Sequence, residues 1–282
     1  MKTLRFASLL LVYVLTGSCG SSGGNGQGEP SDSSSVKTTD TSGLSDMKLY
    51  ALPAPLEVST ALRSYDNAYT TKVFERTKDK TADYLPNYLK GLNLGVYCVD
   101  MGYATVYDDH NMALKYLDKV EKVMNELNLS TQAAAFVKKY KDNINNKDSL
   151  YKFILMSYNE ANRYFRDNKR EDVGLMILTG GFIEGLYISS NIVKKDDQEG
   201  LALIAQQQLY LDNIIELIRT YNQDKDIADL LIRLQDLKSA YYGIEIDYDS
   251  VNSKVRTKTE ITEKQLNLLR LKVSSVRNYI IS

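Results

Sequence analysis

Apolar side chains recur every three or four residues from about residue 56 onward, which is the spacing of one face of an α-helix. The first clear series is Leu85, Leu89, Leu92, Val96, Val99, Tyr103 and Val106, and further series occupy 113–127, 151–165, 204–218, 227–241 and 266–280. Short polar joints separate them at 108–109, 128–130, 146–148, 167–171, 194–198 and 222–224. Joints of this length connect antiparallel neighbours. The pattern therefore predicts an all-α fold, an irregular antiparallel bundle of roughly eight helices.

Prolines and one irregular stretch refine this prediction. Pro53 and Pro55 precede a short first helix, and Pro86 suits the opening turn of the second. Residues 243–258 lack the helical spacing, so we expect a longer loop there with a brief extended piece. The chain shows no fixed internal period, which favours an irregular bundle over a solenoid of helical repeats.

Two of the predicted helices are apolar on almost every side. Residues 92–107 carry one charge, Asp100, and residues 173–193 carry only Glu184. Such a helix is buried in a core or spans a membrane. A span is disfavoured because a carboxylate near the bilayer centre costs about 2.5–3.5 kcal/mol, so we expect two central helices of the bundle. Glycines that let helix backbones approach closely lie in both runs, at Gly95, Gly181 and Gly185.

The start of the chain has the order of a secretory signal peptide. A short basic stretch is followed by an apolar run over 6–15 and by small residues before Cys19. The run has about ten residues, whereas a spanning helix needs about 20. A cysteine directly after the small residues resembles the lipobox of bacterial lipoproteins, in which it becomes the acylated first residue of the mature chain. We expect a signal peptide over 1–18 and lipidation of Cys19 with acyl chains such as palmitate.

The residues after Cys19 are typical of a flexible tether. Residues 20–45 contain almost no large apolar side chain, so they cannot bury enough surface to offset the entropy of ordering. We expect the lipidated cysteine and its tether over 19–48 and one helical domain over 49–282. By resemblance to lipoprotein sorting signals, Gly20 directly after the cysteine favours the outer membrane. The sequence leaves open whether the domain lies on the periplasmic or the surface face.

Charge and cysteine content narrow the classes of partner. The chain has 35 basic and 36 acidic residues and a net charge of −1. Without a net positive field, nucleic acid is not an expected partner. Cys98 is the only cysteine besides Cys19, so acylation of Cys19 leaves no intrachain disulfide. Packing alone must then hold the domain together.

Three segments look like parts of uncharacterised all-helical lipoproteins of Bacteroidetes-type bacteria. They are NLGVYCVDMGYATVYDD at 93–109, LTGGFIEGLYISSN at 178–191 and LPAPLEVSTALRS at 52–64. The likeness covers most of residues 50–220 and implies an all-helical fold and an envelope location. That group has no assigned activity or catalytic residue to transfer. Phe182 departs from its pattern, in which the aromatic residue after the paired glycines is often Trp.

Asp100 and Glu184 are the strongest candidates for a buried polar site. A carboxylate in apolar surroundings has a raised pKa, which suits acid–base chemistry or cation binding. Helical spacing brings further polar groups near them, namely Asn93, Tyr97 and Tyr107 beside Asp100, and Tyr187 and Asn191 beside Glu184. The alternative is structural, with each carboxylate satisfied by tyrosine hydroxyls or by an arginine from a flanking helix. The sequence favours the structural alternative and leaves the functional one open.

Signs of enzymatic chemistry are sparse. His110 is the only histidine, which excludes a two-histidine metal motif, and after Asp108 and Asp109 we expect it to be exposed at a helix start. Cys98 and His110 would lie about 18 Å apart on a continuous helix. The chain has no Ser–His–Asp order, phosphate-binding glycine loop or Cys-x-x-Cys motif. We therefore predict a protein that is not an enzyme and uses neither a cofactor nor a metal.

The chain has 21 tyrosines and no tryptophan. Tyrosine rings stack on sugars, but several of these lie on predicted core faces. The leading hypothesis is a lipid-anchored envelope lipoprotein that acts as a non-enzymatic binding or scaffold module. The alternatives are a small-ligand or cation-binding protein that uses the buried carboxylates, and a glycan-binding accessory lipoprotein. The expected partners are the membrane, through the anchor, and other envelope proteins or glycans.

Overall fold

The computed structural model describes residues 69–75, 86–221, 225–249, 254–257 and 261–281. These ranges contain eight α-helices, α3 (Asn87–Val106), α4 (His110–Glu126), α5 (Ser130–Asn143), α6 (Lys147–Asp167), α7 (Glu171–Ile192), α8 (Gln198–Tyr221), α9 (Lys225–Lys238) and α10 (Glu263–Ile281). They also contain two 3-10 helices, η1 (Thr71–Phe74) and η2 (Ser239–Tyr241), and two strands, β1 (Ile246–Asp249) and β2 (Lys254–Thr257). The predicted signal peptide, Cys19, the tether and the short helix after Pro53 and Pro55 lie outside the described residues.

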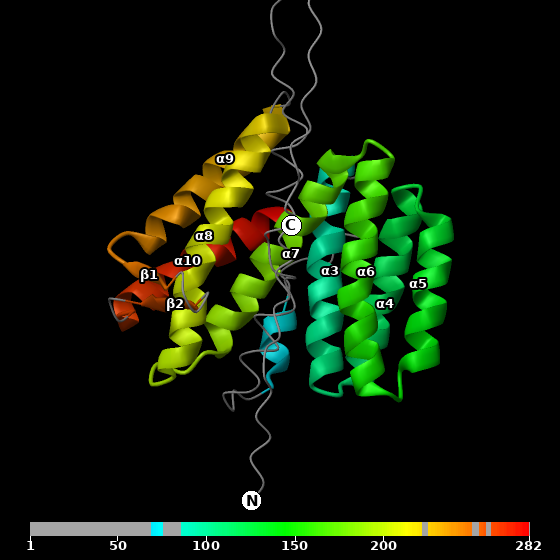
Figure 1. Ribbon diagram of the computed structural model, residues 1–282, viewed down its shortest axis with the longest axis horizontal. Helices are drawn as coiled ribbons and strands as arrows, with labels where there is room; N and C mark the ends of the chain where they lie inside the picture. Colours follow the sequence, from blue (N-terminus) through cyan, green and yellow to red (C-terminus); the bar gives the residue numbers. More distant parts are fainter. Residues whose placement is uncertain (1–68, 76–85, 222–224, 250–253, 258–260, 282) are drawn as a thin grey trace, which may run out of the picture. The chain divides into compact units, whose positions relative to one another are not determined.

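Helix α7 is the central helix of the bundle (Figure 1). It packs against α3 and α6 on one side and against α8 and α10 on the other. Consecutive helices contact each other from α3 to α10, as short joints require. The predicted all-α helical bundle is thus confirmed. The two apolar helices are α3 and α7, and their contact with each other is the most extensive in the bundle.

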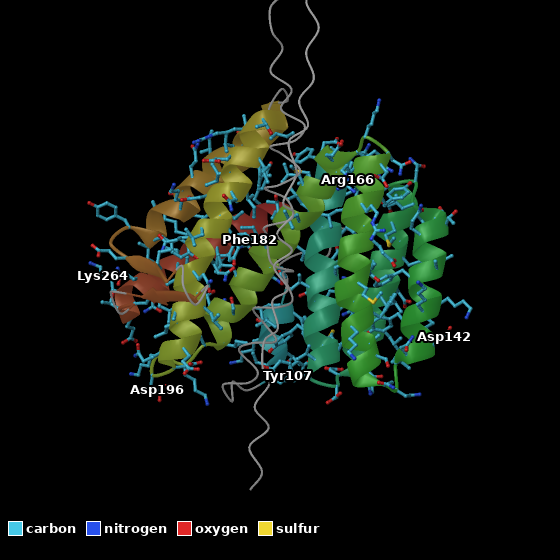
Figure 2. The ribbon with its side chains drawn as sticks, in the orientation of Figure 1. Tyr107, Asp142, Arg166, Phe182, Asp196 and Lys264 are labelled. Carbon is cyan, nitrogen blue, oxygen red and sulfur yellow. The ribbon has the colours of Figure 1, made fainter. Side chains whose placement is uncertain are left out.

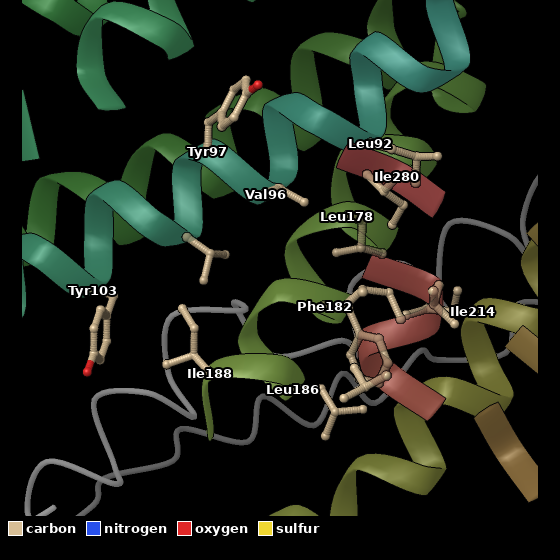
Figure 3. Packing of buried hydrophobic residues seen from close by; sticks show 14 of the residues in the cluster. Leu92, Val96, Tyr97, Tyr103, Leu178, Phe182, Leu186, Ile188, Ile214 and Ile280 are labelled. Carbon is tan, nitrogen blue, oxygen red and sulfur yellow. The ribbon is translucent and has the colours of Figure 1, made fainter. Parts of the chain in front are cut away.

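The core draws residues from helices far apart in the sequence (Figure 3). Leu92 of α3, Leu178 and Phe182 of α7, Ile214 of α8 and Ile280 of α10 belong to one buried cluster. Helix α7 is long and apolar enough to cross a membrane, but 89% of its most apolar window is buried within the protein. Its lack of a polar face therefore reflects burial on every side, as predicted for a central helix.

Glycines allow α3 and α7 to touch through their backbones. A Cβ atom on Gly95 would overlap the carbonyl oxygen of Ile177 and would lie 2.5 Å from the amide nitrogen of Gly181. A Cβ atom on Gly180 would likewise overlap the carbonyl oxygen of Leu92. Because these obstacles are backbone atoms, no side-chain movement can relieve the overlap. The predicted close approach at Gly95 and Gly181 is confirmed, and Gly180 joins it.

The joints between helices form by local chemistry. Asp108, Asn128 and Lys169 follow α3, α4 and α6 in the left-handed conformation, with φ of 61°, 60° and 54°. In each case the next amide bonds the carbonyl five residues back, at 2.9, 2.9 and 2.8 Å, which is the Schellman arrangement. After the first of these joints the Asp109 side chain caps α4, and in the separate joint between α5 and α6 the Asn146 side chain caps α6. Each joint therefore reverses the chain within a few residues.

Two predicted details differ from the structure. Pro86 lies at the N-cap of α3, one residue before the helix, because its backbone is extended with ψ of 154°. The expected loop with an extended piece contains a hairpin, in which Ile246 of β1 lies opposite Thr257 of β2. Each strand has only four residues, which is too short for alternation to reveal the pairing.

Candidate functional site

Glu184 of α7 is fully buried, and Arg277 of α10 holds its carboxylate. Arg277 donates from Nε to Oε2 at 2.7 Å and from Nη2 to Oε1 at 2.9 Å. The same guanidinium donates to the carbonyl oxygens of Val73 at 3.0 Å and Glu75 at 3.2 Å, and it lies 4.1 Å from the centre of the Tyr187 ring. The paired carboxylate, the two carbonyl oxygens and the aromatic ring together stabilise the buried guanidinium charge. Glu184 thus has the arginine partner of the structural alternative.

Two of the residues predicted to lie near Asp100, Asn93 and Tyr97, contact groups in other helices. Asp100 is fully buried on α3, as expected. Asn93 donates to the carbonyl of Leu89 in its own helix at 2.9 Å and to that of Ile280 at 2.8 Å, so it satisfies a carbonyl in the last turn of α10. The Tyr97 ring packs beside Tyr116 and below the Lys119 ammonium, which lies 5.2 Å from the ring centre.

The seven predicted site residues do not form one site. Asn191 is exposed and donates to the Tyr187 carbonyl within its own helix, so its place in a buried site was wrong. Helical spacing put Asn191 near Glu184, but the end of α7 at Ile192 leaves it facing solvent. Tyr107 is the C-cap residue after α3, at one end of the helices (Figure 2), and its ring stacks on Tyr69 with a centroid separation of 5.2 Å.

An aromatic cluster holds the N-terminal segment 69–75 against α3 and α4. Tyr69 and Phe74 contribute rings from this segment, and Tyr103, Tyr107 and Tyr116 contribute rings from the helices. The Tyr69 hydroxyl donates to Asp109 Oδ2 at 2.6 Å. This bond lowers the pKa of Asp109, whereas burial raises the pKa of Tyr69 above its ordinary value. The contacts are those of a packed structural cluster.

A cavity of about 390 Å³ lies among α3, α4, α5, α6 and α7, and we call it the α3–α7 cavity. Its walls are mostly aliphatic and aromatic. They include Leu94, Val99, Met101, Val120, Met124, Phe136, Phe153, Ile154, Phe165 and Ile177. Neither Asp100 nor Glu184 lines it. A concave apolar site of this size is the usual setting for a small ligand.

Strongly polar side chains line the α3–α7 cavity from its two outer helices. Gln132 and Lys139 belong to α5, and Ser157 and Glu160 belong to α6. Lys139 and Glu160 are exposed, so this side of the cavity meets solvent. The Lys139 ammonium lies 5.9 Å from the centre of the Phe153 ring, which is itself part of the wall. The cavity therefore has an apolar interior and a polar, solvent-facing side.

Cys98 lines the α3–α7 cavity and is partly accessible. Burial and the nearby Asp100 carboxylate raise the pKa of its thiol to about 12. At neutral pH the sulfur is therefore a thiol and a poor nucleophile. Cys98 contributes a small apolar surface to the wall.

Metal ligands do not gather in the described part of the chain, where no group of three His, Cys, Asp or Glu side chains could hold an ion. His110 begins α4 and is exposed, as predicted, and Asp109 caps that helix. No family model, curated protein or solved structure matches the chain. The lipoprotein family suggested by the sequence segments remains a prediction.

The sequence interpretation missed the α3–α7 cavity because it searched for charged groups on apolar helices. A cavity arises where small residues from several helices face one another. Here they are Gly95, Cys98, Ala135, Ser157, Ala161 and Gly181. The sequence indicated close helix approach at Gly95 and Gly181, but only the packing of five helices brings all six residues to one cavity. The available signal was the occurrence of small residues among bulky apolar ones on α3, α6 and α7.

Proposed function

We propose that this protein is a lipid-anchored, non-enzymatic binding protein of the cell envelope that holds a small apolar ligand in the α3–α7 cavity. The cavity is the observation that carries the proposal, since its volume of about 390 Å³ lies in the range of small-molecule sites. Its apolar walls favour a ligand driven in by the hydrophobic effect. The predicted acylation of Cys19 supports the envelope location.

The chemistry of the cavity walls supports binding over catalysis. The Cys98 thiol has its pKa raised to about 12, so it offers little thiolate near neutral pH. Glu160 lies on the exposed side, where water competes for its carboxylate. Asp100 and Glu184 do not reach the cavity, so this binding site differs from the carboxylate-dependent one considered from the sequence.

Filling the cavity tests the proposal. The full chain with Cys19→Ser, which cannot be acylated, is titrated with the neutral apolar probe N-phenyl-1-naphthylamine, and probe fluorescence is measured. We expect saturable binding that Ala161→Phe abolishes, because residue 161 lines the cavity and a phenyl ring would occupy it. Ala134→Phe is the matched control, since Ala134 is exposed on α5 and lies off the wall. It should bind the probe normally.

Two results would contradict the proposal. One is an absence of saturable probe binding by the Cys19→Ser chain. The other is undiminished binding by a folded Ala161→Phe variant. Circular dichroism checks folding, and Ser157→Phe fills the same space from one turn earlier on α6 if Ala161→Phe fails to fold. Loss of binding in either folded variant, with retention in Ala134→Phe, supports the proposed site.

A further inference from the structure

The polarity of the α3–α7 cavity changes from one side to the other. Its walls from α3, α4 and α7 present aliphatic side chains, glycines and the Cys98 thiol. All four strongly polar side chains stand on α5 and α6, the two helices at the solvent-facing side. A ligand that matches this distribution is apolar along most of its length and polar at one end. An amphiphile fits both sides, because its polar end can lie among the polar side chains at the solvent-facing side.

Lys139 is the cation of the cavity lining. Its ammonium lies over the Phe153 ring, and it makes no ion pair with any described residue. Its neighbour Lys138 faces elsewhere and pairs with Asp142 at 2.7 Å on the exposed surface of α5, where Figure 2 marks Asp142. Lys139 is thus positioned at the apolar wall with its charge available to a ligand.

The acidic residue of the lining stands away from this point. Glu160 lies seven residues beyond Phe153 on α6, which is about 10 Å along the helix axis. That separation is about one Debye length at about 0.1 M salt, so salt weakens its repulsion of an anion at Lys139. An anionic head beside Lys139 and Phe153 therefore meets an attractive charge.

Resting on the proposed function, we infer that the ligand of the α3–α7 cavity is a free alkyl carboxylate, with its chain between α3, α4 and α7 and its head at Lys139. The carboxylate would accept a charge-assisted hydrogen bond from the Lys139 ammonium. The chain would lie against Met101 and Met124, whose flexible side chains adapt to a mobile alkyl group. The ligand is bound and released without covalent chemistry.

Cys98 provides a readout confined to the cavity. In the Cys19→Ser chain it is the only thiol, so its alkylation by iodoacetamide at pH 9, located by mass spectrometry, reports access to the wall. The reaction is slow, because with a pKa of about 12 only about one thiol in a thousand is ionised at this pH. Decanoate, decanol and decylamine, which share one chain length, are each titrated for protection of Cys98. We expect decanoate to give half-protection at a concentration about tenfold below that of decanol, the factor that corresponds to one charge-assisted bond. Decylamine should be the weakest.

Lys139→Met should remove the preference for decanoate and leave protection by decanol unchanged. Lys138→Met is the matched control and should keep the preference, because Lys138 lies off the wall. Equal protection by decanoate and decanol, or an unchanged preference in Lys139→Met, would overturn the carboxylate inference while N-phenyl-1-naphthylamine binding still upheld the proposed function. If that probe and all three decyl compounds fail to protect Cys98, the proposed function itself fails.

Discussion

At the scale of single residues, Arg277 joins three parts of the chain that are far apart in sequence. Its guanidinium contacts Glu184 on α7, the backbone of Val73 and Glu75 in the N-terminal segment, and the Tyr187 ring. Its side chain is only 3% exposed, so these contacts replace water entirely. A buried ion pair of this kind is costly to break, because removal of one partner leaves an uncompensated charge.

Arg277→Met should destabilise the protein by about 3–5 kcal/mol, the usual cost of leaving a buried carboxylate without its cation. Urea unfolding of the Cys19→Ser chain, followed by circular dichroism, measures the loss. Arg270→Met is the matched control on the same helix, since Arg270 donates to the carbonyls of Ser190 and Val193 and, among the described residues, pairs with no buried carboxylate. It should cost only about 1 kcal/mol. Equal losses of unfolding free energy in both variants would contradict a large contribution of the Arg277–Glu184 ion pair to stability.

At the scale of elements, the contact between α3 and α7 is the feature that the sequence showed most directly. Two runs without a polar face predict two buried helices, and their glycines predict close approach. The polar joints were also visible, because capping depends on residues adjacent in sequence. The pairing of β1 with β2 was not, since four-residue strands carry too little pattern. Local chemistry was therefore easier to predict than pairing between elements.

Gly95→Ala should force α3 and α7 apart and cost about 3 kcal/mol, since overpacking against rigid backbone cannot be relieved by rotamer changes. Differential scanning calorimetry would detect the lower melting temperature. Gly174→Ala on α7 is the comparison, because its new Cβ would lie 3.2 Å from the Cβ of Phe165, a tight contact that a shift of a few tenths of an ångström relieves. We expect that variant to remain within about 1 kcal/mol of the parent. Similar melting temperatures for the two variants would contradict the backbone contact.

At the scale of the whole described domain, the N-terminal segment 69–75 fixes the start of the described chain to the bundle in two places. Tyr69 and Phe74 pack into the aromatic cluster of α3 and α4, and the carbonyls of Val73 and Glu75 bind Arg277. Periodicity could not predict these contacts, because Val73 and Arg277 are 204 positions apart. The cavity was hidden for the same reason, since residues from five helices form it.

Phe74→Ala should loosen this segment and speed tryptic cleavage after Lys72, which is exposed within η1. Loss of a partly buried phenyl ring removes about 2 kcal/mol of packing, so the segment should open more often. Mass spectrometry of timed digests identifies the bond cleaved. Thr71→Ala, at an exposed position of the same 3-10 helix, serves as the control. An unchanged cleavage rate in Phe74→Ala would mean that the aromatic contacts do not hold the segment.

The hydrogen bonds from Arg277 to the N-terminal segment have an evolutionary consequence. The Arg277 guanidinium binds backbone carbonyl oxygens, which every amino acid possesses. The identity of the side chain at position 75, where Glu75 faces solvent, therefore does not affect this contact. Position 184 is different, because its carboxylate is the partner itself. In related chains we therefore expect substitutions at 184 and 277 to occur together, while position 75 changes freely and the path of the backbone stays the same.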